Sequence, residues 1–175
     1  MVKTLEFTTE MFDAVVKGLK TQTRRIMDFK THTGEHYIVD RRRLENASEC
    51  GLFMFSCNCD ECRRNNSHMA IIKGKYEVGD KVMAYDSEGV WEPFCVIEIT
   101  KVRAEKVQDI IEEDAIAEGV NGGCIECGEL QPCGCSNPSP DYIDSFIWIW
   151  NAIHGKDAWE QNPWIWVYEF KRLEK

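Results

Sequence analysis

Two long polar segments that are rich in cysteine interrupt this chain and confine its regular patterns to three blocks. Residues 28–75 carry many Arg, Asn, Cys and His without hydrophobic periodicity, and residues 120–139 form a second such segment. A compact domain rarely carries long irregular segments unless a ligand, metal or partner orders them. We therefore expect a single domain, residues 1–175, with cysteine-rich insertions at about 45–70 and 120–139.

Between these segments the sequence pattern predicts strands and helices that alternate along the chain. The expected strands are Leu5–Phe7, Lys81–Tyr85, Phe94–Glu105 and Trp164–Phe170, and the expected helices run from Thr8 or Thr9 to Gly18, from Asp109 to Gly119 and from Ser139-Pro140 to Ile153. Asp109 and Glu112 have capping-box spacing, and Ser139 followed by a proline is typical of a helix start. This order predicts an α+β fold, a small mixed β-barrel with flanking helices.

The distribution of charge narrows the classes of partner. The net charge of −9 argues against a basic coat for long duplex nucleic acid. However, residues 17–43 hold eight Lys or Arg against three acids, whereas residues 105–144 hold ten acids and one lysine. A local positive face on an acidic body suits a small anionic ligand, a nucleotide or a short single strand. The sequence shows no membrane-crossing stretch and no secretory leader, so we expect a cytoplasmic protein without a membrane partner.

A basic segment, Lys17–Arg25, directly follows the first predicted helix. It offers a hydroxyl nucleophile, a lysine that can activate it, and N–H donors for an oxyanion or phosphate. A solvated basic loop is the alternative. The acidic residue Glu118 ends the second predicted helix, where a carboxylate is unfavourable to the helix dipole. It is either an ordinary solvated acid or a residue with another role.

The second insertion carries four closely spaced cysteines, Cys124, Cys127, Cys133 and Cys135. Structural zinc takes four soft ligands, and a CxxC pair forms one side of such a site. The surrounding residues are poor in core-forming types, so a metal would supply order there. Reduced thiols that bind no metal are the alternative.

The first insertion carries a less complete cluster, Cys57-x-Cys59-x2-Cys62. Cys50 or His68 would provide a fourth ligand, and a site shared between the two insertions is a further alternative. Because the chain has no export signal, clustered cysteines indicate metal binding more often than disulfides. We expect one or two structural zinc ions.

Several separated segments share the pattern of one family. They are GLKTQTRR at 18–25, YEVGD at 76–80, the stretch from Ile97-Glu98-Ile99 through Gln108-Asp109-Ile110, EDAIAEG at 113–119, and Asn162-Pro163-Trp164 through Glu169-Phe170. In this order they resemble the ASCH family of PUA-like β-barrel domains, particularly its bacterial and phage-type members. They frame nearly the whole chain outside the two insertions. The resemblance implies a PUA-like fold and a cleft associated with RNA or modified nucleosides.

The resemblance also implies roles for individual residues. Small ASCH enzymes hydrolyse the amide of N4-acetylcytidine with a lysine and a threonine of the basic segment and a glutamate of the acidic helix. By motif these are Lys20, Thr23 and Glu118, with Arg24 and Arg25 on the substrate-binding side. Thr23 would be the nucleophile, Lys20 the proton acceptor and Glu118 the group that orients Lys20 or activates water. The two insertions depart from the compact enzymes, and they could cover, narrow or block the cleft.

Three functions are compatible with these residues. The first is an amidohydrolase that acts on N4-acetylcytidine-like nucleosides. The second is a non-catalytic module that binds a modified nucleoside, a nucleotide or short single-stranded RNA. The third is a zinc-stabilised interaction protein whose cysteine loops form a partner surface. The first requires Lys20, Thr23 and Glu118 to meet in one pocket, and the sequence leaves the oligomeric state open.

Overall fold

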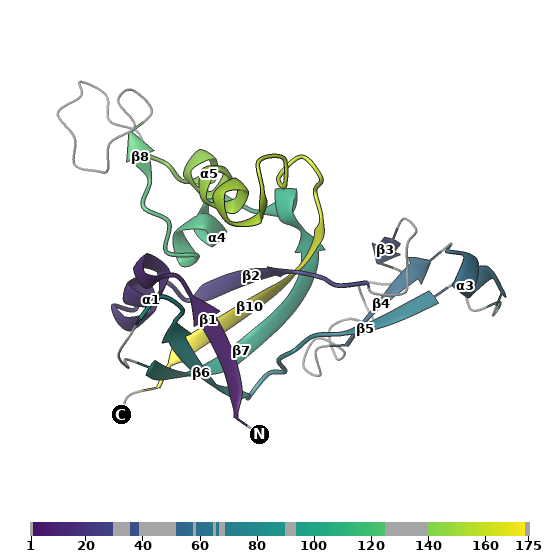
Figure 1. Ribbon diagram of the computed structural model, residues 1–175, viewed down its shortest axis with the longest axis horizontal. Helices are drawn as coiled ribbons and strands as arrows, with labels where there is room; N and C mark the ends of the chain where they lie inside the picture. The colour runs from purple at the N-terminus through teal and green to yellow at the C-terminus, as the bar shows by residue number, and fades with distance from the viewer. Residues whose placement is uncertain are drawn as a thin grey trace.

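A five-stranded mixed sheet forms the centre of the protein. The computed structural model describes residues 2–29, 36–38, 52–57, 59–64, 66, 69–89, 94–124 and 140–173. The sheet has the order β1-β6-β7-β10-β2 and consists of β1 (Lys3–Phe7), β6 (Lys81–Asp86), β7 (Phe94–Lys106), β10 (Trp164–Arg172) and β2 (Gln22–Ile26) (Figure 1). β1 pairs with β6 in parallel, and the other neighbours are antiparallel. The α+β class is confirmed.

The five-stranded sheet is open. The expected β-barrel was therefore wrong for the described part of the chain. β1 and β2 are the two edge strands of the sheet, and no pairing joins them within the described residues. Side chains take the place of strand partners at this seam. Arg25 Nη2 donates to the Glu6 carbonyl at 2.6 Å, Lys75 Nζ donates to the Thr4 carbonyl at 3.1 Å, and the Tyr76 hydroxyl donates to the same carbonyl. These donors satisfy two β1 carbonyls at the edge of the sheet that faces β2.

The first helix follows the sequence closely. α1 (Thr9–Val16) has Thr8 as its N-cap, whose hydroxyl accepts from the Met11 N–H at 3.5 Å. Gly18 follows the helix with a φ of +73°, a conformation that favours glycine. The second half of the basic segment Lys17–Arg25 is a strand, because residues from Gln22 onward belong to β2. Thr23, Arg24 and Arg25 are therefore held by strand pairing.

The second predicted helix starts differently from the expected capping box. Asp109 lies in a 3₁₀ turn, η1 (Val107–Asp109), where its carboxylate accepts from the Lys106 N–H at 3.3 Å. α4 (Glu112–Ala117) then begins after Ile111, which makes no side-chain cap. The capping box over Asp109 and Glu112 was wrong because the acid already caps the preceding turn.

The last helix begins two residues after the expected proline. Pro140 and Asp141 form the short strand β9 (Pro140–Asp141), which pairs with β8 (Gly123–Cys124). α5 (Tyr142–His154) starts with Asp141 as N-cap, whose carboxylate accepts from the Asp144 N–H at 2.8 Å. The cap of α5 is therefore Asp141, whereas the expected cap, Ser139, lies outside the described residues.

The first polar segment contains a second sheet, which corrects the expectation of an irregular insertion. Its strands are β3 (His36–Ile38), β4 (Leu52–Cys57) and β5 (Met69–Lys73), in antiparallel order β3-β4-β5, and α3 (Asp60–Arg64) lies between the last two. Figure 1 shows this unit projecting from the end of the main sheet. The apolar residues at 52–55 and 69–72, embedded in a polar stretch, account for the hairpin.

Two cores cover the two faces of the main sheet. On β10, Trp166, Tyr168 and Phe170 face one core, and Ile165 and Val167 face the other. The second core is completed by α4 and α5, which lie together on one side of the sheet in Figure 1. Burial on both faces explains why β10 is almost continuously apolar.

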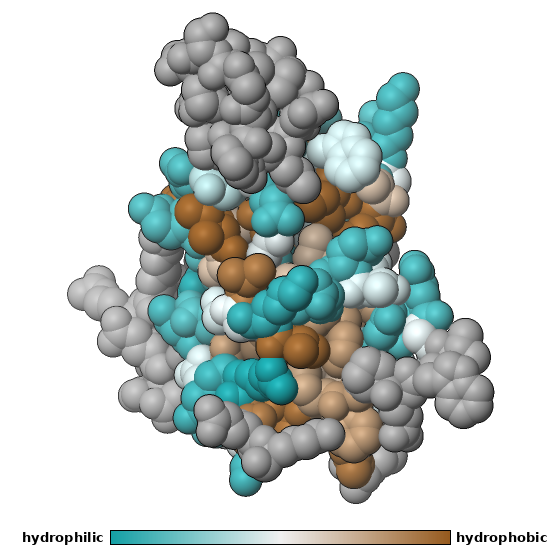
Figure 2. Space-filling model, turned by 90° about the vertical axis from the view of Figure 1, so that its left-hand side faces the viewer, coloured by the Kyte–Doolittle hydropathy of each residue, from teal (hydrophilic) through white to brown (hydrophobic). Residues whose placement is uncertain are grey.

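The surface shows no single dominant apolar region on the face drawn in Figure 2. Hydrophobic side chains there lie in several groups, with hydrophilic side chains between them. No helix in the described part of the chain is long and apolar enough to cross a membrane.

Candidate functional site

A cavity of about 900 Å³ opens at the seam between the edge strands β1 and β2. Its lining combines residues of the basic segment with the end of α4, the inner face of α5 and the aromatic residues of β10. Lys20, Thr23, Arg24, Arg25 and Glu118 all line it. The structure therefore brings every residue of the proposed catalytic and substrate-binding set to one place.

Lys20 and Glu118 form a buried ion pair in the wall of this cavity. Lys20 Nζ lies 2.6 Å from Glu118 Oε2 and 2.7 Å from the Glu118 carbonyl oxygen. The two residues are 4% and 5% exposed. Burial lowers the pKa of Lys20 from its ordinary value, and the contact with Glu118 opposes that shift only in part. This geometry places a lysine with a weakened hold on its proton beside a fixed carboxylate.

Backbone contacts hold the two halves of the pair together. The Lys20 N–H donates to the Ala14 carbonyl at 3.1 Å, and the Thr21 N–H donates to the Ala117 carbonyl at 2.8 Å. Gly119 has a φ of +78° and lies against Lys20. The end of α4 thus docks directly onto the turn that follows α1.

Arg24 is held by three carboxylates. Its Nη1 lies 2.9 Å from Glu118 Oε1, and its Nη2 lies 2.9 Å from both Glu105 Oε1 and Asp114 Oδ2. The side chain is 1% exposed. Arg103 also contacts Asp114, at 3.1 Å, which extends the ionic network across β7 and α4. Both terminal nitrogens of Arg24 are therefore engaged within the protein, and one of them fixes Glu118.

Thr23 and Arg25 lie on the other face of β2. The register places Thr23 opposite Tyr168 and Arg25 opposite Trp166, toward the first core, whereas Arg24 is opposite Val167. Thr23 is buried, with 2% of its surface exposed. Arg25 donates to the Glu6 carbonyl, and its guanidinium lies 5.5 Å from the centroid of the Phe7 ring. Among the described residues no carboxylate pairs with Arg25.

The cavity also contains residues that sequence reasoning did not assign to it. Burial raises the pKa of Tyr168 to about 12, and the hydroxyl accepts from the Lys75 N–H at 3.2 Å. Tyr76 packs edge-on against Tyr168 with ring centroids 5.0 Å apart. Burial, with a smaller contribution from Arg25, lowers the pKa of His154, which favours its neutral form. The aromatic alternation along β10 was the available signal for Tyr168.

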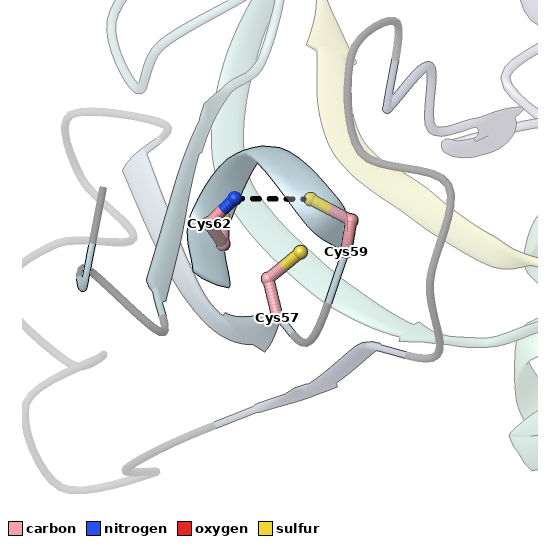
Figure 3. A group of neighbouring side chains, drawn as sticks. All are labelled: Cys57, Cys59 and Cys62. Carbon is pink, nitrogen blue, oxygen red and sulfur yellow. Dashed lines mark hydrogen bonds between the residues drawn. The ribbon is translucent and has the colours of Figure 1, made fainter. Parts of the chain in front are cut away.

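The first cysteine cluster forms a second candidate site (Figure 3). The sulfur atoms of Cys57, Cys59 and Cys62 all lie within 4.8 Å of one another, and the three residues are buried. The Cys62 N–H donates to Cys59 Sγ at 3.5 Å. Burial raises the pKa of the Cys57 thiol to about 11. The three sulfur atoms are close enough together to hold a metal ion.

The second predicted cluster is described only at its first residue. Cys124 belongs to β8, whereas Cys127, Cys133 and Cys135 lie outside the described residues. Cys50 and His68, the candidate fourth ligands of the first cluster, also lie outside them. The four-cysteine site and the shared site therefore stay predictions.

Comparison with known proteins adds no assignment to this geometry. A scan of protein-family models, a search of curated proteins and a search of solved structures each returned no match to the chain.

Proposed function

We propose that this protein is an ASCH-type amidohydrolase of PUA-like fold that acts on N4-acetylcytidine-like nucleosides. The observation that carries the proposal is the buried contact of 2.6 Å between Lys20 Nζ and Glu118 Oε2, in a cavity that Thr23 also lines. Proton transfer by an amine needs a lowered pKa, and burial supplies it here. The sequence resemblance supplies the substrate class.

The proposed reaction begins with attack by the Thr23 hydroxyl oxygen on the acyl carbonyl carbon. The neutral Lys20 amine accepts the hydroxyl proton, and Arg25 donates hydrogen bonds to the oxyanion that forms. Collapse breaks the carbon–nitrogen bond, and the Lys20 ammonium returns the proton to the leaving amine. Water then attacks the acyl ester on Thr23 and gives a proton to Lys20. The acyl carbon–oxygen bond breaks, the Lys20 ammonium returns its proton to the Thr23 oxygen, and acetic acid leaves and ionises to acetate. Glu118 holds the Lys20 side chain in position throughout.

The size and lining of the cavity support a nucleoside as substrate. Sites for small molecules enclose about 300–1,000 Å³, and the 900 Å³ here lies within that range. Tyr76, Tyr168 and Trp150 contribute aromatic side chains to its lining, and each is at most 3% exposed. Glu118 and Arg25 add polar groups of opposite charge.

The surroundings of Arg25 favour the second candidate function, a non-catalytic module that binds a nucleotide or short single-stranded RNA. Arg25 brings a positive charge to the cavity without a carboxylate partner among the described residues, and only one of its five N–H groups has an assigned acceptor. Such a group binds phosphate through paired hydrogen bonds.

The deciding experiment measures release of cytidine and acetate from N4-acetylcytidine. Thr23→Ala and Lys20→Ala should each reduce kcat by about a hundredfold or more. Thr21→Ala and Lys17→Ala are matched controls, because both side chains are exposed and neither lines the cavity. Absence of turnover by the wild-type protein, with nucleotide binding that Arg25→Ala weakens, would favour the binding module.

We also propose that the ion held by Cys57, Cys59 and Cys62 is zinc in a structural role. Zinc is the usual ion of thiolate-rich tetrahedral sites, and reduced thiols fit the proposed cytoplasmic location. Elemental analysis should find zinc in the purified protein and lose one equivalent in Cys57→Ser but none in Cys95→Ser, a buried thiol on β7. A metal-free wild-type protein would contradict this proposal and with it the zinc-stabilised interaction protein.

A further inference from the structure

Ile72 connects the cysteine cluster with the cavity. This partly buried residue packs against the buried Cys57, Cys59 and Cys62, and it also packs against the core beneath the main sheet. It lines the cavity as well, together with its neighbours Ile71 and Lys73 on β5. One strand of the small sheet is therefore a wall of the cavity and at the same time a support for the cysteines.

The neighbouring strand, β4, attaches this hairpin to the rest of the protein. Phe53, Phe55 and Cys57 are buried at alternate positions and therefore share one face of β4. Phe53 packs edge-on against Trp166 at 5.2 Å, and Phe55 does the same against Trp164 at 5.1 Å. Cys57 thus ends the row of side chains that fastens the hairpin over the cavity.

The cysteine cluster joins the end of β4 to a helix that has little stability of its own. α3 has five residues, far fewer than an isolated helix needs in water. Cys59 precedes this helix and Cys62 lies inside it, while Cys57 ends the strand. The Cys62 N–H donates to Cys59 Sγ, which ties the helix to the residue that precedes it. A metal ion bound here would cross-link the strand and the helix.

We propose that Cys57, Cys59 and Cys62 form a thiolate site for a soft divalent cation that fixes the β5 wall of the cavity, so that cation and cavity ligand bind with positive coupling. The ligand half of this statement rests on the proposed function. Coupling of this kind is reciprocal, because each partner stabilises the conformation that the other binds.

The first part of the test follows the cavity wall without any ligand. Hydrogen exchange of the backbone amides of Ile71, Ile72 and Lys73 is measured in the full-length protein as Zn²⁺ is added. Exchange should slow by up to about a hundredfold when free Zn²⁺ reaches about 100 times its Kd. Cys59→Ser should abolish this protection, whereas Cys95→Ser should keep it. Unchanged exchange in the wild-type protein, with Zn²⁺ bound, would overturn the proposal.

The second part measures the coupling itself by calorimetry with N4-acetylcytidine as the probe, in the full-length Thr23→Ala variant, because removal of the proposed nucleophile prevents hydrolysis of the probe. Its Kd should be at least about fivefold lower with Zn²⁺ than after chelation. Ile72→Ala should still bind one Zn²⁺ at the cluster but show less difference between the two states. Equal affinities with and without Zn²⁺ would overturn the coupling. No binding in either state, with zinc-dependent exchange intact, would contradict the proposed function and leave the metal-supported wall established.

Discussion

Gly119 lies so close to Lys20 that no side chain fits between them. A Cβ atom built on Gly119 would be 2.9 Å from the Cβ of Lys20 and 3.1 Å from the Cβ of Ala14. Both of these atoms are attached directly to the backbone, so neither can move aside as the end of a long side chain can. This close approach brings Glu118, the last acidic residue of the motif, within reach of the Lys20 ammonium. The glycine of the motif is therefore required by the geometry of the ion pair.

Gly119→Ala should consequently damage both stability and the site. Gly18→Ala is the matched control, because Gly18 has a similar φ of +73° but nothing within 4 Å of its added Cβ. Both variants should lose about 1–2 kcal/mol from backbone strain, and Gly119→Ala should lose about 1–3 kcal/mol more from the clash. Denaturant unfolding measures the difference. Equal losses in the two variants would show that the contact with Lys20 relaxes without cost.

Arg24→Ala should be among the most destabilising substitutions in the protein. It leaves the carboxylates of Glu118, Glu105 and Asp114 without the guanidinium that joins them. Removing one partner of a buried charge network costs about 3–5 kcal/mol in the free energy of unfolding. Lys17→Ala breaks the exposed pair with Asp13 and should cost at most about 1 kcal/mol. Similar losses for the two would contradict a structural role for Arg24.

Arg25 should behave differently, because its guanidinium is not committed to a carboxylate in the described part of the chain. In the proposed reaction it contacts the acyl oxygen, and in the binding alternative it contacts phosphate. Arg25→Ala should therefore lower kcat of an amidohydrolase by about a hundredfold, as loss of an oxyanion donor does. For a binding module it should raise the Kd for a nucleotide and leave stability nearly unchanged. A large loss of stability would indicate that the bond to Glu6 closes the seam instead.

The parts of the fold that follow local rules were predictable from the sequence. Thr8 caps α1, Gly18 ends it, and the alternating β-branched residues of β7 form the expected strand, because each depends on near neighbours in the chain. The predicted starts of α4 and α5 were wrong, and the reason is again local. Asp109 caps the 3₁₀ turn before α4 instead of the helix itself, and Asp141 caps α5 two residues after the expected Ser139.

The arrangement of the residues around the cavity depends on contacts between distant parts of the chain, which a single sequence does not reveal. Lys20 and Glu118 are 98 positions apart, and only the motif resemblance linked them. At the open edge between β1 and β2, the β1 carbonyl of Thr4 accepts from the side chains of Lys75 and Tyr76, a contact between parts of the chain about 70 residues apart. The commitment of Arg24 to three acids likewise needed the coordinates, since neighbouring Arg24 and Arg25 look equivalent in the sequence but face opposite sides of β2.

The pH dependence of activity should distinguish a Lys20 base from a purely electrostatic Lys20. Burial lowers the pKa of this lysine below its ordinary 10.5, so its neutral form appears at lower pH than in the unfolded chain. If Lys20 accepts the proton of Thr23, kcat/KM rises with pH up to that lowered pKa and then levels off. If its ammonium is required instead, kcat/KM falls through the same pKa. Rates with N4-acetylcytidine, from about pH 6 to pH 10, decide between the two.

The same shift predicts a signature in stability that needs no substrate. Between the lowered pKa and 10.5 the unfolded chain binds one more proton at Lys20 than the folded protein does. The contribution of Lys20 to the free energy of unfolding therefore rises with pH across this window. Below the window this contribution does not change with pH. Lys20→Met removes the titrating group at similar length, so its unfolding curve should lack this contribution. A wild-type protein and a Lys20→Met variant with parallel stability profiles would show that Glu118 holds Lys20 charged over the whole range, which would contradict its role as the base.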